Sequence, residues 1–161
     1  MKISSLKKLT AVLLASSFFI FCSKDNGTDA QGTFFCKVNG KDYKPKFVTG
    51  YQDGITQTIL VTGATGSNSE QVQFHFPGNI TAGTYTQLND YSSGTFISVS
   101  YSPAHSEEAG DDGIAKTGGV VITEHNTSAK RIKGTFHFIS APSINAGTIW
   151  NITDGNFDVK Y

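Results

Sequence analysis

The residues on either side of two histidines indicate that both imidazoles could bind a metal ion on the surface of a β-sheet. His75 and His137 each lie between two phenylalanines. Because side chains alternate along a strand, core-facing phenylalanines leave both imidazoles on the outer face, where neighbouring strands could bring them to one zinc ion. His125 or Glu124 is the candidate third ligand. Zinc needs three or four converging ligands, and no tight ligand spacing is present, so solvated histidines are the favoured interpretation and no cofactor is predicted.

The second group of candidate functional residues is acidic. The long connection between residues 103 and 118 contains Glu107, Glu108, Asp111 and Asp112. Long loops in compact domains often carry function, and carboxylate oxygens suit calcium. The twelve-residue calcium-loop pattern is absent, so a solvated loop is favoured, with calcium binding and partner contact as alternatives.

Covalent catalysis has no recognisable machinery in this sequence. No Gly-x-Ser-x-Gly turn presents a nucleophile, and the sequence assigns no carboxylate pair for glycoside hydrolysis. Exposed aromatics such as Phe35, Tyr91 or Trp150 could stack on sugar rings, although Trp150 alternates with Ile152 and so favours the core. A noncatalytic protein that binds a glycan, protein or small ligand, or serves structurally, is therefore predicted. The alternative is a metal-dependent or glycan-directed enzyme.

The first 22 residues predict where the protein resides. Three lysines precede an apolar run over residues 9–21, which ends at Cys22. A run of this length is shorter than the roughly 20 residues of a membrane-spanning helix, so residues 1–21 resemble a signal peptide. A cysteine at this point is typical of bacterial lipoproteins, which predicts lipidation of Cys22 and anchoring in the envelope, with the outer membrane favoured. The bulky residues before Cys22 depart from the usual small residue, and a plain signal peptide is the alternative.

The remaining chain has the composition of one tethered domain. Residues 22–31 are small and polar, which indicates a flexible tether, and residues 32–161 form the predicted domain. Removing three lysines leaves 13 − 3 = 10 basic residues against 13 acidic ones, a balance that argues against nucleic acid as partner. With Cys22 lipidated, Cys36 has no disulfide partner and is expected to face the core.

Period-two alternation runs through the domain and predicts an all-β fold. Asn39-Gly40 and Asp154-Gly155 are both typical of tight hairpin turns. We expect a two-sheet antiparallel sandwich of about ten strands, with a single closed, lipocalin-like up-and-down barrel as the alternative. The expected strands cover residues 34–38, 41–47, 47–51, 56–62, 71–76, 84–88, 95–102, 119–123, 131–140, 148–152 and 156–161.

Four strand and turn segments are distinctive: Gly-Val-Val-Ile-Thr at 119–123, Lys-Arg-Ile-Lys-Gly-Thr-Phe-His-Phe at 130–138, residues 152–161, and the first hairpin at 34–43. Together they resemble a family of uncharacterised lipoproteins from Bacteroidetes. The resemblance implies a secreted, β-rich, lipid-anchored domain. It supplies no catalytic residues.

Overall fold

The computed structural model describes residues 32–66, 70–92, 94–104, 113–142 and 148–161. Cys22 and the acidic residues Glu107, Glu108, Asp111 and Asp112 lie outside these ranges. Within the described part of the chain, no helix has the length and apolar character needed to span a membrane.

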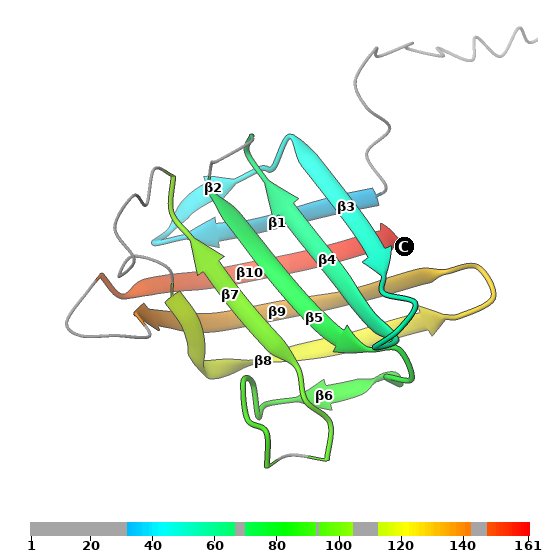
Figure 1. Cartoon of the computed structure of the whole chain (residues 1–161). Coiled ribbons are helices and arrows are strands. Elements are labelled where there is room, and N and C mark those ends of the chain that lie inside the picture. The colour runs from blue at the N-terminus through cyan, green and yellow to red at the C-terminus, as the bar shows by residue number, and fades with distance from the viewer. Residues whose placement is uncertain (1–31, 67–69, 93, 105–112, 143–147) are drawn as a thin grey trace, which may run out of the picture.

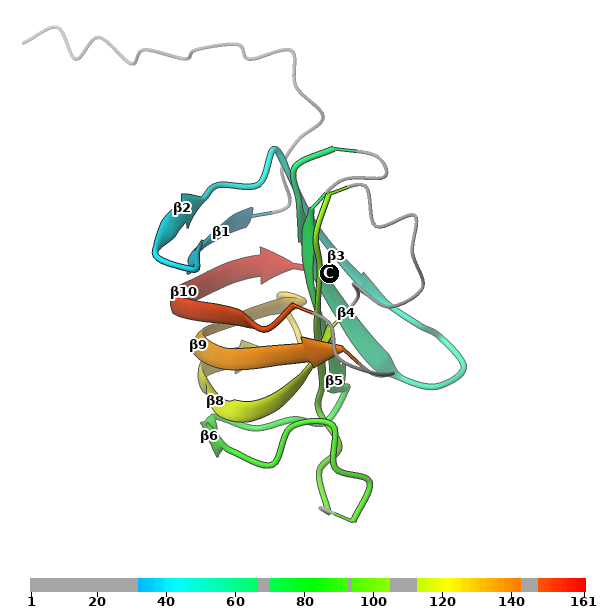
Figure 2. The ribbon, with the colours of Figure 1, turned by 90° about the vertical axis from the view of Figure 1, so that its left-hand side faces the viewer.

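Ten strands form one sheet that curls strongly on itself and stays open (Figure 1, Figure 2). All the ladders between these strands are antiparallel, in the order β2-β1-β10-β9-β8-β7-β5-β4-β3, while β6 pairs with β8. The all-β prediction with about ten strands is confirmed. The strands are β1 Gly32–Val38, β2 Lys41–Tyr43, β3 Phe47–Gln52, β4 Thr58–Ala64, β5 Gln71–Pro77, β6 Gly83–Tyr85, β7 Ser98–Ser102, β8 Gly113–Asn126, β9 Arg131–Pro142 and β10 Trp150–Lys160.

The predicted division into two separate sheets does not describe this arrangement, because β8 joins the two halves. The start of β8 pairs with β7 through Ile114 and Gly113, while most of the strand pairs with β9. Register shifts after Ala115 and after Ile122 bend β8, as bulges do, so the sheet turns without a break. The closed-barrel alternative does not describe it either, because the terminal strands of the order, β2 and β3, do not pair with each other.

The core fills the inside of the curl with phenylalanine rings. Alternate residues of each strand point inward, and Phe74 stands at the centre, with ring centroids 4.8 Å from Phe136 and 5.6 Å from Phe157. Cys36 is fully buried, as predicted, and burial raises the pKa of its thiol to about 12. The core therefore holds by packing, with an unreactive cysteine inside it.

One of the two predicted hairpins is confirmed and the other is wrong. Asn39 and Gly40 have φ values of 48° and 78° and join β1 to β2, as expected for this turn. Asp154 also has a positive φ, 52°, yet β10 continues through it as one strand with a bulge between Ile152 and Gly155. The bulge places the glycine against a phenylalanine of β9: a Cβ at Gly155 would lie 2.4 Å from the Phe136 ring.

Candidate functional site

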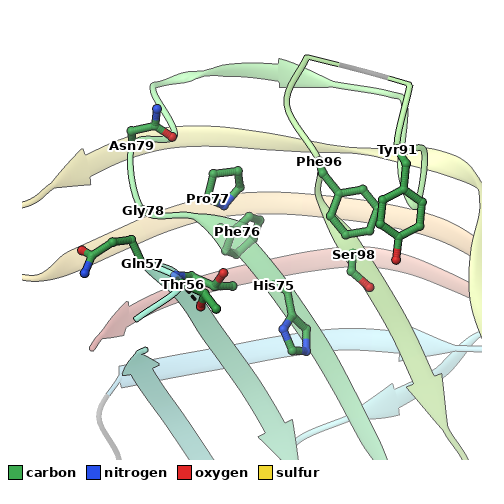
Figure 3. Close-up of a pocket in the computed structure, with 11 residues that line it drawn as sticks. Thr56, Gln57, His75, Phe76, Pro77, Gly78, Asn79, Tyr91, Phe96 and Ser98 are labelled. Carbon is green, nitrogen blue, oxygen red and sulfur yellow. Dashed lines mark hydrogen bonds between the residues drawn. The ribbon is translucent and has the colours of Figure 1, made fainter. Parts of the chain in front are cut away.

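An open cleft of about 840 Å³ lies on the outside of the curled sheet, at the ends of β4, β5 and β7 (Figure 3). Its volume is within the range of ordinary small-molecule sites. The described residues that line it carry no carboxylate, amine or guanidinium group. They are Thr56, Gln57, Thr58, His75, Phe76, Pro77, Gly78, Asn79, Tyr91, Phe96 and Ser98.

Two stacked aromatic rings form one wall of the cleft. The rings of Tyr91 and Phe96 lie 4.1 Å apart at an interplanar angle of 14°, from the segment between β6 and β7 (Figure 3). Tyr91 is 86% exposed. An exposed aromatic held flat by a partner offers an apolar surface that is already oriented for a ligand.

The opposite wall is built by the turn between β3 and β4. The Asp53 carboxylate accepts hydrogen bonds from the backbone N–H groups of Ile55, at 2.9 Å, and Thr56, at 2.6 Å, which fixes the turn. Gln57 then takes a positive φ of 56°. Gly78 packs against this turn, because a Cβ there would lie 2.2 Å from the Gln57 carbonyl oxygen. The wall is therefore fixed by backbone geometry as well as by side chains.

The cleft continues into a wider uncharged surface, which we call the neutral face. It consists of the outward side chains of β3, β4, β5 and β7, which the strand register places in rows such as Thr49-Thr62-Gln73-Ser100. Apart from the imidazole of His75, these side chains are hydroxyls, amides, apolar groups and aromatic rings. The members are Phe47, Thr49, Tyr51, Thr58, Leu60, Thr62, Ala64, Gln71, Gln73, His75, Pro77, Ser98, Ser100 and Ser102.

His75 lies where the cleft meets the rest of the neutral face (Figure 3). Partial burial lowers the pKa of its imidazole, which favours the uncharged form at neutral pH. One ring nitrogen lies 3.2 Å from the Gln73 side-chain oxygen. The imidazole is therefore a neutral hydrogen-bonding group of this surface.

The outside of β8, β9 and β10 has the opposite character. Asp158 binds Arg131 in a two-bond ion pair, and Lys133 lies between this carboxylate and Glu124. A shallower hollow of about 580 Å³ on the same side includes Asp154, which pairs with a lysine of β1. The two halves of the sheet thus present chemically different outer surfaces, one ionic and one neutral.

Comparison with protein families gives one result. A family model described as "Domain of unknown function (DUF6252)" matches residues 30–159. The chain belongs to this family. The match agrees with the resemblance in that the family is uncharacterised, whereas the lipid anchor implied by that resemblance stays a prediction. Neither the curated proteins nor the solved structures contain a match.

The histidines of this DUF6252 domain are not brought together. His75 lies on β5 and His137 on β9, and β7 and β8 separate those two strands. His125 instead lies 2.7 Å from both the Ile80 carbonyl and the Tyr161 hydroxyl, while Glu124 pairs with Lys133. Among the described residues, no group of three or more His, Cys, Asp or Glu side chains could hold a metal ion.

The predicted aromatic candidates of the DUF6252 domain are divided between the surface and the core. Tyr91 lines the cleft, Trp150 packs on the core with its ring 5.2 Å from Tyr101, and Phe35 is half-buried beneath the Lys44 ammonium. Neither Phe96 nor the neutral face was predicted from the sequence. The signal was present in two short alternations, Ser-x-Ser-x-Ser at 98–102 and Gln-x-Gln-x-His at 71–75.

Proposed function

We propose that this protein is a noncatalytic ligand-binding lipoprotein of the bacterial envelope, anchored through Cys22, and that its ligand binds the cleft and the neutral face. The observation that carries the binding role is the cleft itself, a hollow of about 840 Å³ with one wall made by the exposed Tyr91 ring stacked on Phe96. Binding sites of this kind combine a large apolar surface with a few polar groups.

The anchor is supported by the N-terminal sequence. A basic start, a short apolar run and a cysteine at its end are the elements of a lipoprotein signal. The polar residues 22–31 would then separate the lipid from the domain. Such a tether leaves the neutral face free to meet ligands at the surface of the membrane.

The chemistry of the cleft favours binding over catalysis. General acid–base or nucleophilic chemistry uses groups with matched pKa values within hydrogen-bond reach of each other. Here the described lining offers one imidazole, His75, whose nearest hydrogen-bonding partner in the fold is the amide of Gln73. A neutral amide orients an imidazole but does not act as a base.

The anchor is tested by the intact mass of protein extracted from native membranes. We expect an increase of acyl-glyceryl size that is lost in Cys22→Ala. An unmodified wild-type product would contradict the anchor without bearing on the cleft.

The binding surface is tested by amide NMR shifts of the domain, residues 32–161, during titration with three ligand classes: neutral oligosaccharides, short peptides and fatty acids. We expect at least one class to shift amides of the cleft and the neutral face. Shifts confined to the outside of β8–β10 in every titration would contradict the site.

A further inference from the structure

We infer that the ligand of the neutral face is an uncharged oligosaccharide chain, which stacks one sugar ring on Tyr91 and extends across β5 toward Tyr51. This inference rests on the proposed binding function and names its ligand class. It follows from the charge, the hydrogen-bonding groups and the aromatic positions of one surface.

Charge narrows the ligand class first. A solvated sheet surface is ordinarily covered with ionic side chains, as the outer surface of β8–β10 is here. The neutral face presents none over four adjacent strands, and burial favours the uncharged form of His75. The nearest charge described beside the cleft is the Asp53 carboxylate, whose hydrogen bonds hold its own turn. The strands of the neutral face offer no ion pair to a phosphate, a carboxylate or an ammonium group, so a charged ligand gains nothing from them to offset its desolvation.

The polar side chains of the neutral face are suited to hydrogen-bond the hydroxyl groups of a sugar. Serine and threonine hydroxyls and glutamine amides can each donate and accept hydrogen bonds, as sugar hydroxyls also do. The register aligns these groups across the strands: Gln73 lies between Thr62 and Ser100, and Gln71 lies opposite Ser102. A row of groups with both capacities suits a polyhydroxylated chain better than an apolar one.

The aromatic side chains complete the match because they lie at both ends of this surface. Sugar rings have apolar C–H faces that pack flat on an aromatic ring. Tyr91, stacked on Phe96, supplies one such platform beside Ser98 (Figure 3). At the other edge, Tyr51 is 58% exposed and Phe47 is 44% exposed. Phe47 and Tyr51 lie on the same outer face of β3, so a ligand that crosses the sheet meets two exposed rings there.

The distance between Tyr91 and Tyr51 can be bridged only by a ligand with several sugar rings. The register places Tyr51, Leu60, His75 and Ser98 in one row across four strands. Three strand spacings of about 4.8 Å make this row roughly 14 Å long. A single sugar can occupy the Tyr91 platform, but only an oligosaccharide can also reach Tyr51.

Calorimetry with chains of defined length tests the inference. Wild-type domain is titrated with cellohexaose, mannohexaose and xylohexaose, with the corresponding disaccharides, and with an acidic oligogalacturonate of six rings. We expect at least one neutral hexaose to bind, its disaccharide to bind more weakly, and the acidic chain to give no heat.

Three variants assign the contacts. Tyr91→Ala should weaken hexaose binding about tenfold, as removal of an interface anchor does. Tyr51→Ala should weaken the hexaose but not the disaccharide. Ile139→Ala, which trims an exposed side chain on the outer surface of β9, is the matched control and should change nothing. All three positions are exposed, so the melting temperature should stay within a few degrees of wild type.

Two results would overturn the inference while leaving the proposed function intact. In the first, peptides or fatty acids shift amides of the neutral face and no neutral hexaose binds. In the second, a hexaose binds and Tyr91→Ala leaves its affinity unchanged. Hexaose binding that shifts only amides on the outer surface of β8–β10 would contradict the inference. It would contradict the proposed site as well if peptides and fatty acids also leave the amides of the cleft unshifted.

Discussion

At the scale of single residues, two buried polar atoms have no hydrogen-bond partner among the residues that the structure describes. They are the Ser140 hydroxyl on β9 and the Trp150 indole N–H on β10, and the two residues are opposite each other in the register. Ser140 is fully buried, and a Cβ at Gly113 would lie 2.0 Å from its Oγ, so the hydroxyl is tightly enclosed. A buried hydroxyl without a partner lowers the stability of the fold.

We expect Ser140→Ala to raise the free energy of unfolding by about 1 kcal/mol, because the variant removes an unsatisfied group and little volume. Urea unfolding followed by circular dichroism measures the change. Ser100→Ala, a half-exposed serine of the neutral face, is the control and should stay within about 0.5 kcal/mol of wild type. A loss of stability in Ser140→Ala would mean that the hydroxyl has a partner.

Alternation predicted the inward orientation of Cys36 correctly, because burial in a strand follows a period of two. The same alternation places Ser140 inward, in phase with Phe136 and Phe138. It could not predict how tightly the hydroxyl is enclosed, which depends on what β8 and β10 place around it. Nor could it show that Tyr91 would be held flat by Phe96, since that contact is made between loop residues rather than along a strand.

At the scale of elements, an ionic network joins β9 to β10. The Arg131 guanidinium donates two hydrogen bonds to Asp158 and, with the nearby Lys133 ammonium, holds the pKa of that carboxyl below its ordinary value. A lowered folded-state pKa adds stability above the ordinary pKa of aspartate, about 3.9, and this stability is lost as the pH falls through the folded-state value.

We therefore expect Asp158→Asn to be less stable than wild type by about 1 kcal/mol at pH 7, with the difference shrinking below pH 4 and vanishing in stronger acid. Urea unfolding over a pH series tests this. Asp42→Asn, which removes an exposed pair with Lys44, should differ little from wild type at any pH. A difference for Asp158→Asn that does not change with pH would indicate lost packing rather than lost charge.

The two Gly-containing turn motifs show that local sequence alone does not determine whether a strand folds back or continues. Asn39-Gly40 and Asp154-Gly155 have the same chemistry, and both include a residue with positive φ. The first makes a hairpin because β2 is free to fold back on β1. The second makes a bulge because β10 is paired on both sides, with β1 and β9, so the positive φ is absorbed within one strand.

At the scale of the whole molecule, the strand number was predictable and the closure of the sheet was not. Sequence periodicity determines which residues face inward, but a sandwich, a barrel and an open curled sheet use the same alternation. The difference lies in β8, whose two register shifts let one strand serve both halves of the sheet. Such bulges have no signature in this sequence beyond Gly118, which has a φ of 136°.

The same topology makes the end of the chain essential to the fold. β10 lies between β1 and β9, so residues 157–159 are paired on both sides, and Phe157 packs within 5.6–5.7 Å of two core phenylalanines of β5. Losing a buried phenylalanine alone costs about 3–5 kcal/mol, and Val159, which is fully buried, adds to this. The sum approaches the whole stability of a typical domain, 5–15 kcal/mol.

We expect deletion of residues 157–161 to abolish cooperative thermal unfolding, as monitored by circular dichroism. Deletion of Tyr161 alone is the graded control: it removes one hydroxyl contact with His125 and one backbone bond to Lys130. That loss should lower the melting temperature by roughly 4 °C, the effect of about 1 kcal/mol in a domain of this size. A five-residue deletion that melts cooperatively near the wild-type temperature would contradict the central position of β10, because the deletion removes the end of the strand that pairs with both β1 and β9.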